Sequence, residues 1–240
     1  MCIAIMYNMF GSQNPITILF SAVLITLLSI EFFIPSFLST LITSMFYSPN
    51  QQIIAEIITA AGIPFKDNTT TTTTSFLTYE NPTYRIRMQY PSNWERIEFD
   101  QGINYNVVVI FRSPPENASD TKLENLVIQV ANLPFQNISL EELHNANLDN
   151  LRNSLTDFEL IESVATTIAY SPAHKIVFTN REDDHDRHKT IQVLTIKEDK
   201  SYLITYAAEA AKYDHYLSTI QNMIDSFRIG VRVGESGEII

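Results

Sequence analysis

Residues 79–94 read YENPTYRIRMQYPSNW and carry the clearest structural signal in the chain. Apolar and polar side chains alternate through the middle of this segment, one set being Tyr84, Ile86, Met88 and Tyr90 and the other Arg85, Arg87 and Gln89. Because successive side chains of a strand point to opposite faces, the alternation predicts a half-buried strand. The Asn-Pro pair predicts a turn between two short strands, of which this is the second, and the Tyr-Pro pair predicts its end, with Trp94 anchoring the next segment.

Further along the chain, strand-like runs rich in β-branched and aromatic residues occur at 106–111, 124–133, 158–168, 173–179, 190–196 and 201–208. A first helix is predicted after Ser139, which forms a capping box with Glu142 and precedes a stripe of leucines. A second helix is predicted over about 212–226, where the apolar residues are Tyr213, Tyr216, Leu217, Ile220, Met223, Ile224 and Phe227.

The order of these elements is strands, a helix, more strands and a closing helix. This order predicts an α+β domain in which helices flank an antiparallel sheet, and not a βαβ nucleotide-binding fold. The polar segments 181–188 and 198–200 join neighbouring strand-like runs and are typical of hairpin connections.

Several aromatic and proline positions also indicate a family. Tyr79, Asn81-Pro82, Tyr84, Tyr90-Pro91 and Trp94 form Y-x-NP-x-Y-x5-YP-x2-W, which resembles the opening of PsbP-like domains, including PsbP-related proteins of archaea. The likeness extends over about residues 76–229, as far as the IDSF sequence at 224–227. It implies an α-β-α sandwich around an antiparallel sheet, used mostly for binding and accessory roles. In plants and cyanobacteria PsbP assists the oxygen-evolving photosystem at a membrane surface. Arg85 departs from the family pattern, where a small residue, often glycine, follows the tyrosine.

The N-terminal quarter differs sharply from the rest. All 16 Lys and Arg residues come after residue 65, and residues 1–65 contain only two acids, Glu31 and Glu56. Residues 16–34 are almost entirely apolar and are close to the roughly 20 residues that a membrane-spanning helix needs. The sequence therefore predicts a transmembrane helix at about 16–34, within a hydrophobic segment 1–48.

A buried core helix and a cleaved signal peptide are the alternatives to an anchor. A second apolar stretch at 37–46 makes the whole region hard to bury in a small domain. The start has no positively charged region, and no small-x-small cleavage site follows the apolar run, which favours a retained anchor. Orientation is not given by Lys and Arg, because none lies near the predicted span.

The predicted domain organisation follows from composition. Residues 49–75 are expected to form a juxtamembrane helix and a Thr-rich linker, residues 76–229 the PsbP-like domain, and residues 230–240 a C-terminal tail. The Thr run at 69–75 and the glycosylation-type sequons at Asn68, Asn117 and Asn137 favour placing the domain outside the cytoplasm. Single-pass membrane localisation, with lipid contacted by the N-terminal segment, is the resulting prediction.

Composition excludes several function classes. A net charge of −11 argues against nucleic acid as a partner, because such binding depends on neutralising phosphates with Lys and Arg. Cys2 is the single cysteine and lies near the N-terminus, so the domain has no cysteine nucleophile and no Cys-based zinc site. No G-x-S-x-G elbow and no phosphate-binding glycine loop occurs among the six glycines. No catalytic residues are assigned, and the protein is predicted not to be an enzyme.

One segment concentrates metal-ligating groups. Asp183, Asp184, His185, Asp186 and His188 lie in one polar turn, and such carboxylates and imidazoles suit a divalent cation. The alternative is a solvated hairpin tip, since the spacing is not that of an EF-hand. His174 is interpreted as a core histidine, and His144 and His215 as helical residues without a role.

The leading functional hypothesis is a membrane-tethered, extracytoplasmic, non-catalytic binding or accessory module that contacts another envelope protein. A divalent-metal-binding domain using the 183–188 turn is the alternative, and a hydrolase is a further one that requires a polar pocket with perturbed carboxylates. Apart from that divalent cation, no cofactor is predicted.

Overall fold

A computed structural model describes residues 75–99, 106–118, 120, 122–133, 138–181 and 187–230, all within one compact unit. The described elements are two helices, α4 (Leu140–Ser154) and α5 (Leu217–Ser226), and the strands β1 (Phe76–Asn81), β2 (Ile86–Pro91), β3 (Glu95–Glu98), β4 (Val107–Arg112), β5 (Asn125–Asn132), β6 (Thr156–Ile168), β7 (Ser171–Arg181), β8 (Arg187–Lys197), β9 (Lys200–Glu209) and β10 (Arg228–Ile229). The predicted anchor, juxtamembrane helix, linker and C-terminal tail lie outside these residues, apart from Ser75 and Gly230. No helix in the described ranges has the length and apolar character needed to cross a bilayer.

The strands form two antiparallel sheets, and not the one sheet that the sequence predicts. Seven strands pair in the order β3-β4-β5-β9-β8-β7-β6, and three pair in the order β1-β2-β10. The predicted strand around Ile86 is therefore β2, the centre of the smaller sheet. Its predicted faces are confirmed, because Ile86, Met88 and Tyr90 are buried while the side chains between them are not.

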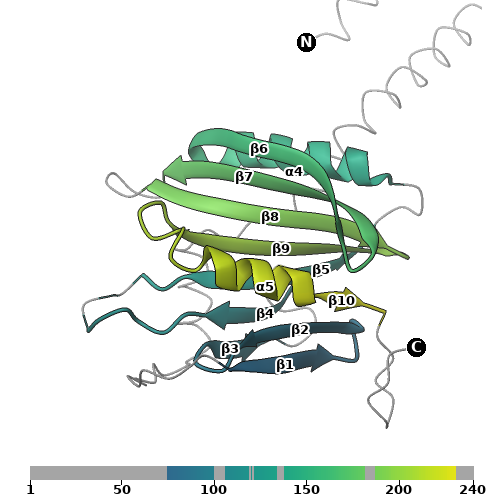
Figure 1. Cartoon of the computed structure of the whole chain (residues 1–240). Coiled ribbons are helices and arrows are strands. Elements are labelled where there is room, and N and C mark those ends of the chain that lie inside the picture. Colours follow the sequence, from purple (N-terminus) through teal and green to yellow (C-terminus); the bar gives the residue numbers. More distant parts are fainter. Residues whose placement is uncertain are drawn as a thin grey trace, which may run out of the picture. The chain divides into compact units, whose positions relative to one another are not determined.

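The main core lies between the seven-stranded sheet on one side and the smaller sheet with α5 on the other. Its members come from both sheets and from α5, which contributes Ile220, Met223 and Ile224. Helix α4 covers the opposite face, where Leu148 and Leu151 pack on Ile176 and Phe178 of β7. Figure 1 shows α5 in front of the large sheet and α4 behind it. The α+β layering with a helix on each face agrees with the predicted fold class.

The two helices begin in different ways. Ser139 caps α4, accepting a hydrogen bond from the Glu142 N–H while the Glu142 carboxylate accepts one from the Ser139 N–H, so the predicted capping box is confirmed. Helix α5 begins at Leu217, five residues later than predicted, and Tyr216 makes no side-chain cap. Residues 210–216 form turns, because the Tyr206 hydroxyl and the Glu209 carbonyl bind the backbone of Tyr213 and hold the chain against the sheet.

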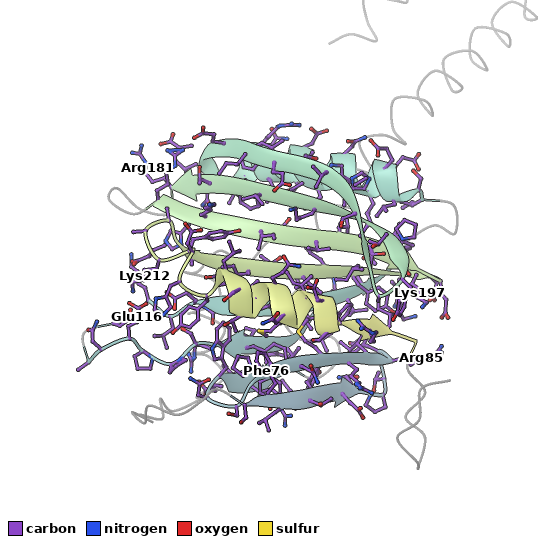
Figure 2. All side chains as sticks on the ribbon, in the orientation of Figure 1. Phe76, Arg85, Glu116, Arg181, Lys197 and Lys212 are labelled. Carbon is purple, nitrogen blue, oxygen red and sulfur yellow. The ribbon has the colours of Figure 1, made fainter. Side chains whose placement is uncertain are left out.

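Arg85, which departs from the family pattern, adopts a backbone conformation that glycine favours. Its φ is 54°, in the left-handed region that glycine occupies more readily than other residues. The Arg85 carbonyl accepts a hydrogen bond from the Gly230 N–H, at 2.8 Å, and its guanidinium donates to the Gly230 carbonyl, at 3.3 Å. These two hydrogen bonds fasten the end of β10 beside the start of β2. Figure 2 shows Arg85 at the same end of the domain as Lys197, which donates to the Ile229 carbonyl.

Candidate functional site

The predicted metal-binding turn falls almost entirely outside the described residues. Asp183, Asp184, His185 and Asp186 belong to the segment 182–186, whose structure is not described. His188 is described: it is buried near the start of β8 and pairs across the sheet with Asn180 and Glu209. Within the described ranges no group of three or more His, Cys, Asp or Glu side chains is arranged to hold a metal ion. The divalent-cation site stays a prediction.

Two histidines to which the sequence assigned no role lie together between α4 and the large sheet. His144 of α4 stacks on His174 of β7, with ring centroids 4.2 Å apart and an interplanar angle of 12°. His144 Nε2 lies 3.0 Å from the Ser163 hydroxyl, and His174 Nε2 lies 3.3 Å from the Glu141 carboxylate. Each histidine therefore has its own polar partner, and the stacked rings form no Ser-His-Glu relay of the catalytic kind. The cluster joins α4 to β6 and β7.

The histidine stack predicts a pH-dependent stability. Burial, the neighbouring His174 and Arg152 lower the pKa of His144 from its ordinary value of 6.5, against the opposing charge of Glu141. The unfolded chain therefore binds a proton at a higher pH than the folded chain, so this stabilisation is complete above pH 6.5 and is lost as the pH falls through the folded pKa. Urea unfolding at pH 7.5 and at stepwise lower pH values measures it.

The control is His144→Gln, which keeps an amide able to bond Ser163 but has no ring to protonate. We expect the free energy of unfolding to fall more steeply on acidification in the wild type than in H144Q. Identical pH profiles for the two proteins would show that His144 does not contribute.

A second cluster of charged groups fastens two loops at the other end of the sheet from Arg85 and Lys197. The β4–β5 loop contributes Glu116 and Asp120, the end of β9 contributes Glu209, and the turns after β9 contribute Lys212. The Lys212 ammonium donates to Asp120 Oδ1 at 2.7 Å and lies 3.5 Å from Glu209 Oε2. Figure 2 shows Glu116 and Lys212 close to one another at this end.

The protonation of this ion pair follows from its surroundings. Burial would raise the pKa of Asp120, but hydrogen bonds from Lys212 and from the Glu116 N–H outweigh it and lower that pKa. The hydrogen bond to Asp120 raises the pKa of Lys212. Both groups are therefore charged at neutral pH, and the Asp120 side chain is only 3% exposed. The pair works as a fixed clasp between the loops.

Glu124 lies beside this clasp and is the most deeply buried acid of the cluster, at 1% exposure. It accepts a hydrogen bond from the Ser113 hydroxyl at 2.7 Å, while Oε1 has no hydrogen-bond partner among the described residues. Burial raises the pKa of this carboxyl. Glu124 therefore holds Ser113 and the two strand ends together from a buried position. Lys212, Asp120 and Glu124 could not be singled out from the sequence, since isolated charges in loops carry no recognisable spacing.

The longest open backbone edge in the described part of the chain belongs to β6. This strand is the last of the seven-stranded sheet and has 13 residues. Two large apolar side chains on it are exposed, Ile161 by 54% and Val164 by 38%, and Tyr170 in the turn that follows is 91% exposed. Exposed apolar side chains on an edge strand are available for contact with a partner. We refer to residues 161–170 as the β6 surface.

A family model described as "PsbP-like protein" matches residues 54–229. This range covers most of the chain and includes every described strand and helix. The chain therefore belongs to the PsbP-like protein family, as the resemblance at residues 79–94 predicts. A search of curated proteins gave no significant match.

Solved structures give likenesses of fold at low identity. Cyanobacterial PsbP (CyanoP) from Synechocystis sp. PCC 6803 is 15% identical, with a TM-score of 0.48, over 69% of this chain and 99% of its own. LpqN of Mycobacterium tuberculosis, described as involved in cell envelope biogenesis, is 11% identical, with a TM-score of 0.49, over 60% and 82%. PA94 from Pseudomonas aeruginosa, a putative regulator by its description, is 16% identical, with a TM-score of 0.45, over 63% and 94%. At this identity the likeness concerns the fold alone.

Proposed function

We propose that this protein is a membrane-tethered, non-catalytic binding or accessory module whose PsbP-like domain contacts a protein partner outside the cytoplasm. The apolar segment 16–34 supports the tether, and the Thr run and sequons support the side of the membrane. The histidine stack and the charged cluster around Lys212 support a non-catalytic role, because His144, Lys212 and Glu124 each fasten one element to another.

The β6 surface is the observation that carries this proposal. Ile161, Val164 and Tyr170 leave apolar area exposed on one edge strand and its turn. Elsewhere among the described residues the exposed large apolar side chains are Phe76 and Leu77 of β1. A strand edge combined with exposed apolar side chains offers both backbone hydrogen bonds and side-chain contacts to a partner.

Site-specific photo-cross-linking in intact cells tests the proposal. A photoreactive phenylalanine analogue is placed at Ile161 or Val164 in the full chain, and control chains carry it at Leu77 of β1 or at Asn222 on the exposed side of α5. We expect adducts of defined mass from the β6 positions and none from the controls. Adducts at all four positions alike, or at none, would contradict a specific binding surface on β6.

The same cells test the tether. Protease added to intact cells should remove the adducts if the domain lies outside the cytoplasm, and N-terminal sequencing should find residues 16–34 retained. Protection of the adducts in intact cells, with digestion only after lysis, would place the domain on the other side and overturn that part of the proposal.

A further inference from the structure

The two halves of β6 differ in how their open edge is protected. In the first half the pairing with β7 is irregular at Thr156–Glu159 and again at Leu160–Glu162. Asp157 and Glu159 in this half form ion pairs with Arg181 and Arg187. Bulges and charges are the usual devices by which a protein keeps an edge strand from pairing with another chain. The first half is therefore blocked.

The second half has no such protection. Residues 163–168 read SVATTI, which contains no charge, no proline and no glycine, and Ser163 to Thr167 are exposed. Pairing with β7 is regular from Glu162 to Ile168. Uncharged segments of β-branched residues on an edge favour pairing with a further strand. By contrast, the opposite edge of the same sheet is β3, with four residues of which Glu95, Arg96 and Glu98 are charged.

The register identifies which backbone groups face the open edge. Ala169 and Tyr170 form a two-residue turn with φ values of 49° and 60°, so Ile168 and Ser171 are the hydrogen-bonded pair that closes the hairpin. Because bonded and non-bonded pairs alternate in an antiparallel ladder, the N–H and C=O groups of Ser163, Ala165 and Thr167 point away from β7. Pro172, which has no N–H to donate, stands opposite Thr167, as a non-bonded pair allows.

We propose that the segment 163–168 pairs antiparallel with the same segment of a second copy of this chain. This inference rests on the proposed function, since it assigns a partner to the β6 surface. The register that uses all three outward-facing residues places Ala165 opposite Ala165 of the second copy and Ser163 opposite its Thr167. The seven-stranded sheets of the two copies then join into one continuous sheet.

The segment is complementary to a second copy of itself, because in this register the hydroxyl residues Ser163 and Thr167 oppose one another and the β-branched Val164 opposes Thr166. In this register no charged residue opposes another, because positions 163–168 are uncharged in both chains. The nearest acid, Glu162, is already paired with Lys175 at 3.0 Å and faces Ile168 of the second copy. Helix α4 lies on one face of the large sheet, where it packs on β7 and β8 and its His144 contacts the Ser163 hydroxyl, while the backbone groups of Ser163, Ala165 and Thr167 point away from β7 along the sheet.

A charge introduced at the centre of the segment tests this pairing in the full chain purified in detergent. We expect sedimentation to show a dimer for the wild type, and loss of that dimer for Ala165→Lys and for Ala165→Glu, because each puts like charges opposite one another. An equimolar mixture of the two variants should regain the dimer, which no folding defect of either variant would produce. Dimers that persist in both single variants, or a monomeric wild type, would overturn the inference.

Cysteine cross-linking checks the register independently, in a chain carrying Cys2→Ser. Ala165→Cys should form a disulfide-linked dimer, because opposed residues of a bonded pair lie about 5.5 Å apart, within disulfide range. Ser163→Cys should not, since the two copies of residue 163 would be offset by four residues, about 14 Å along the strands. Cross-linking at both positions alike, or at residue 163 alone, would contradict this register.

Photo-cross-linking separates the failure of this inference from the failure of the proposed function. An adduct from Val164 with the mass of two chains supports the second copy. An adduct with a different protein, together with a monomeric wild type, overturns the second copy while leaving the β6 surface as a partner-binding site. The absence of any adduct from β6 overturns both.

Discussion

Phe111→Ala should lower the free energy of unfolding by about 3–5 kcal/mol, the usual range for a phenylalanine deleted from a packed core. Phe111 lies on β4 of the large sheet and is fully buried. Its ring lies 5.6 Å from that of Tyr79 on β1 and 4.7 Å from that of Tyr90 on β2. The two sheets share no strand pairing, so side chains such as this one hold them together.

The measurement is urea unfolding, followed by the fluorescence of the single tryptophan, Trp94, which is buried against Tyr216. Phe76→Ala is the matched control, because Phe76 is 39% exposed at the start of β1 and its removal leaves no cavity in the core. We expect a change within about 0.5 kcal/mol for the control. If F111A were no more destabilised than F76A, Phe111 would not join the sheets.

The sequence predicted local structure well where one face of an element is buried. Alternation marked β2, and the Ser139–Glu142 capping box marked the start of α4, because each signal depends on residues within one element. The family pattern even located a backbone feature: the position where glycine is common is Arg85, whose φ is positive. These features can be predicted without knowing which residues far away in the sequence pack against them.

The features that the sequence did not predict depend on contacts between distant segments. The Asn-Pro turn indicates that β1 pairs with β2, but nothing near β2 indicates that its other neighbour is β10, more than 130 residues away, and so the separate three-stranded sheet was missed. The late start of α5 has the same origin, because the Tyr206 hydroxyl holds the Tyr213 carbonyl and keeps the preceding residues in turns. The apolar periodicity of 213–227 reflects which side chains are buried. Because the turns before α5 bury side chains as the helix does, the pattern did not show where the helix begins.

The histidines show the same limit for candidate sites. His144 and His174 are separated by 30 positions in the sequence, and each alone is typical of a structural residue. Their stacking arises only because α4 packs across β7. In contrast, the β6 surface could have been suspected from SVATTI, but its exposure depends on the sheet ending at β6, which is a property of the topology.

Lys212→Met should lower the free energy of unfolding by about 2–3 kcal/mol. Removing one partner of a fully buried ion pair costs about 3–5 kcal/mol, because the remaining charge stays desolvated. Here Asp120 is almost completely buried while the Lys212 side chain is 25% exposed, so water partly replaces the lost contact. Methionine keeps most of the apolar stem of lysine, so the change removes the ammonium with little loss of packing.

A double-mutant cycle with Asp120→Asn isolates the ion pair from other effects. Once Lys212 is gone, Asp120 is a buried carboxylate close to Glu124, so its neutralisation by asparagine should restore part of the lost stability. The matched control is Arg152→Met, which breaks an exposed pair with Asp149, at 3.1 Å, and should cost no more than about 0.5 kcal/mol. Additive effects of K212M and D120N would contradict the clasp. A coupling energy above the roughly 1 kcal/mol that exposed pairs reach would show that the β4–β5 loop is fastened to the turns before α5 through this contact. The β6 surface lies on other elements, so it should keep its partner in both variants.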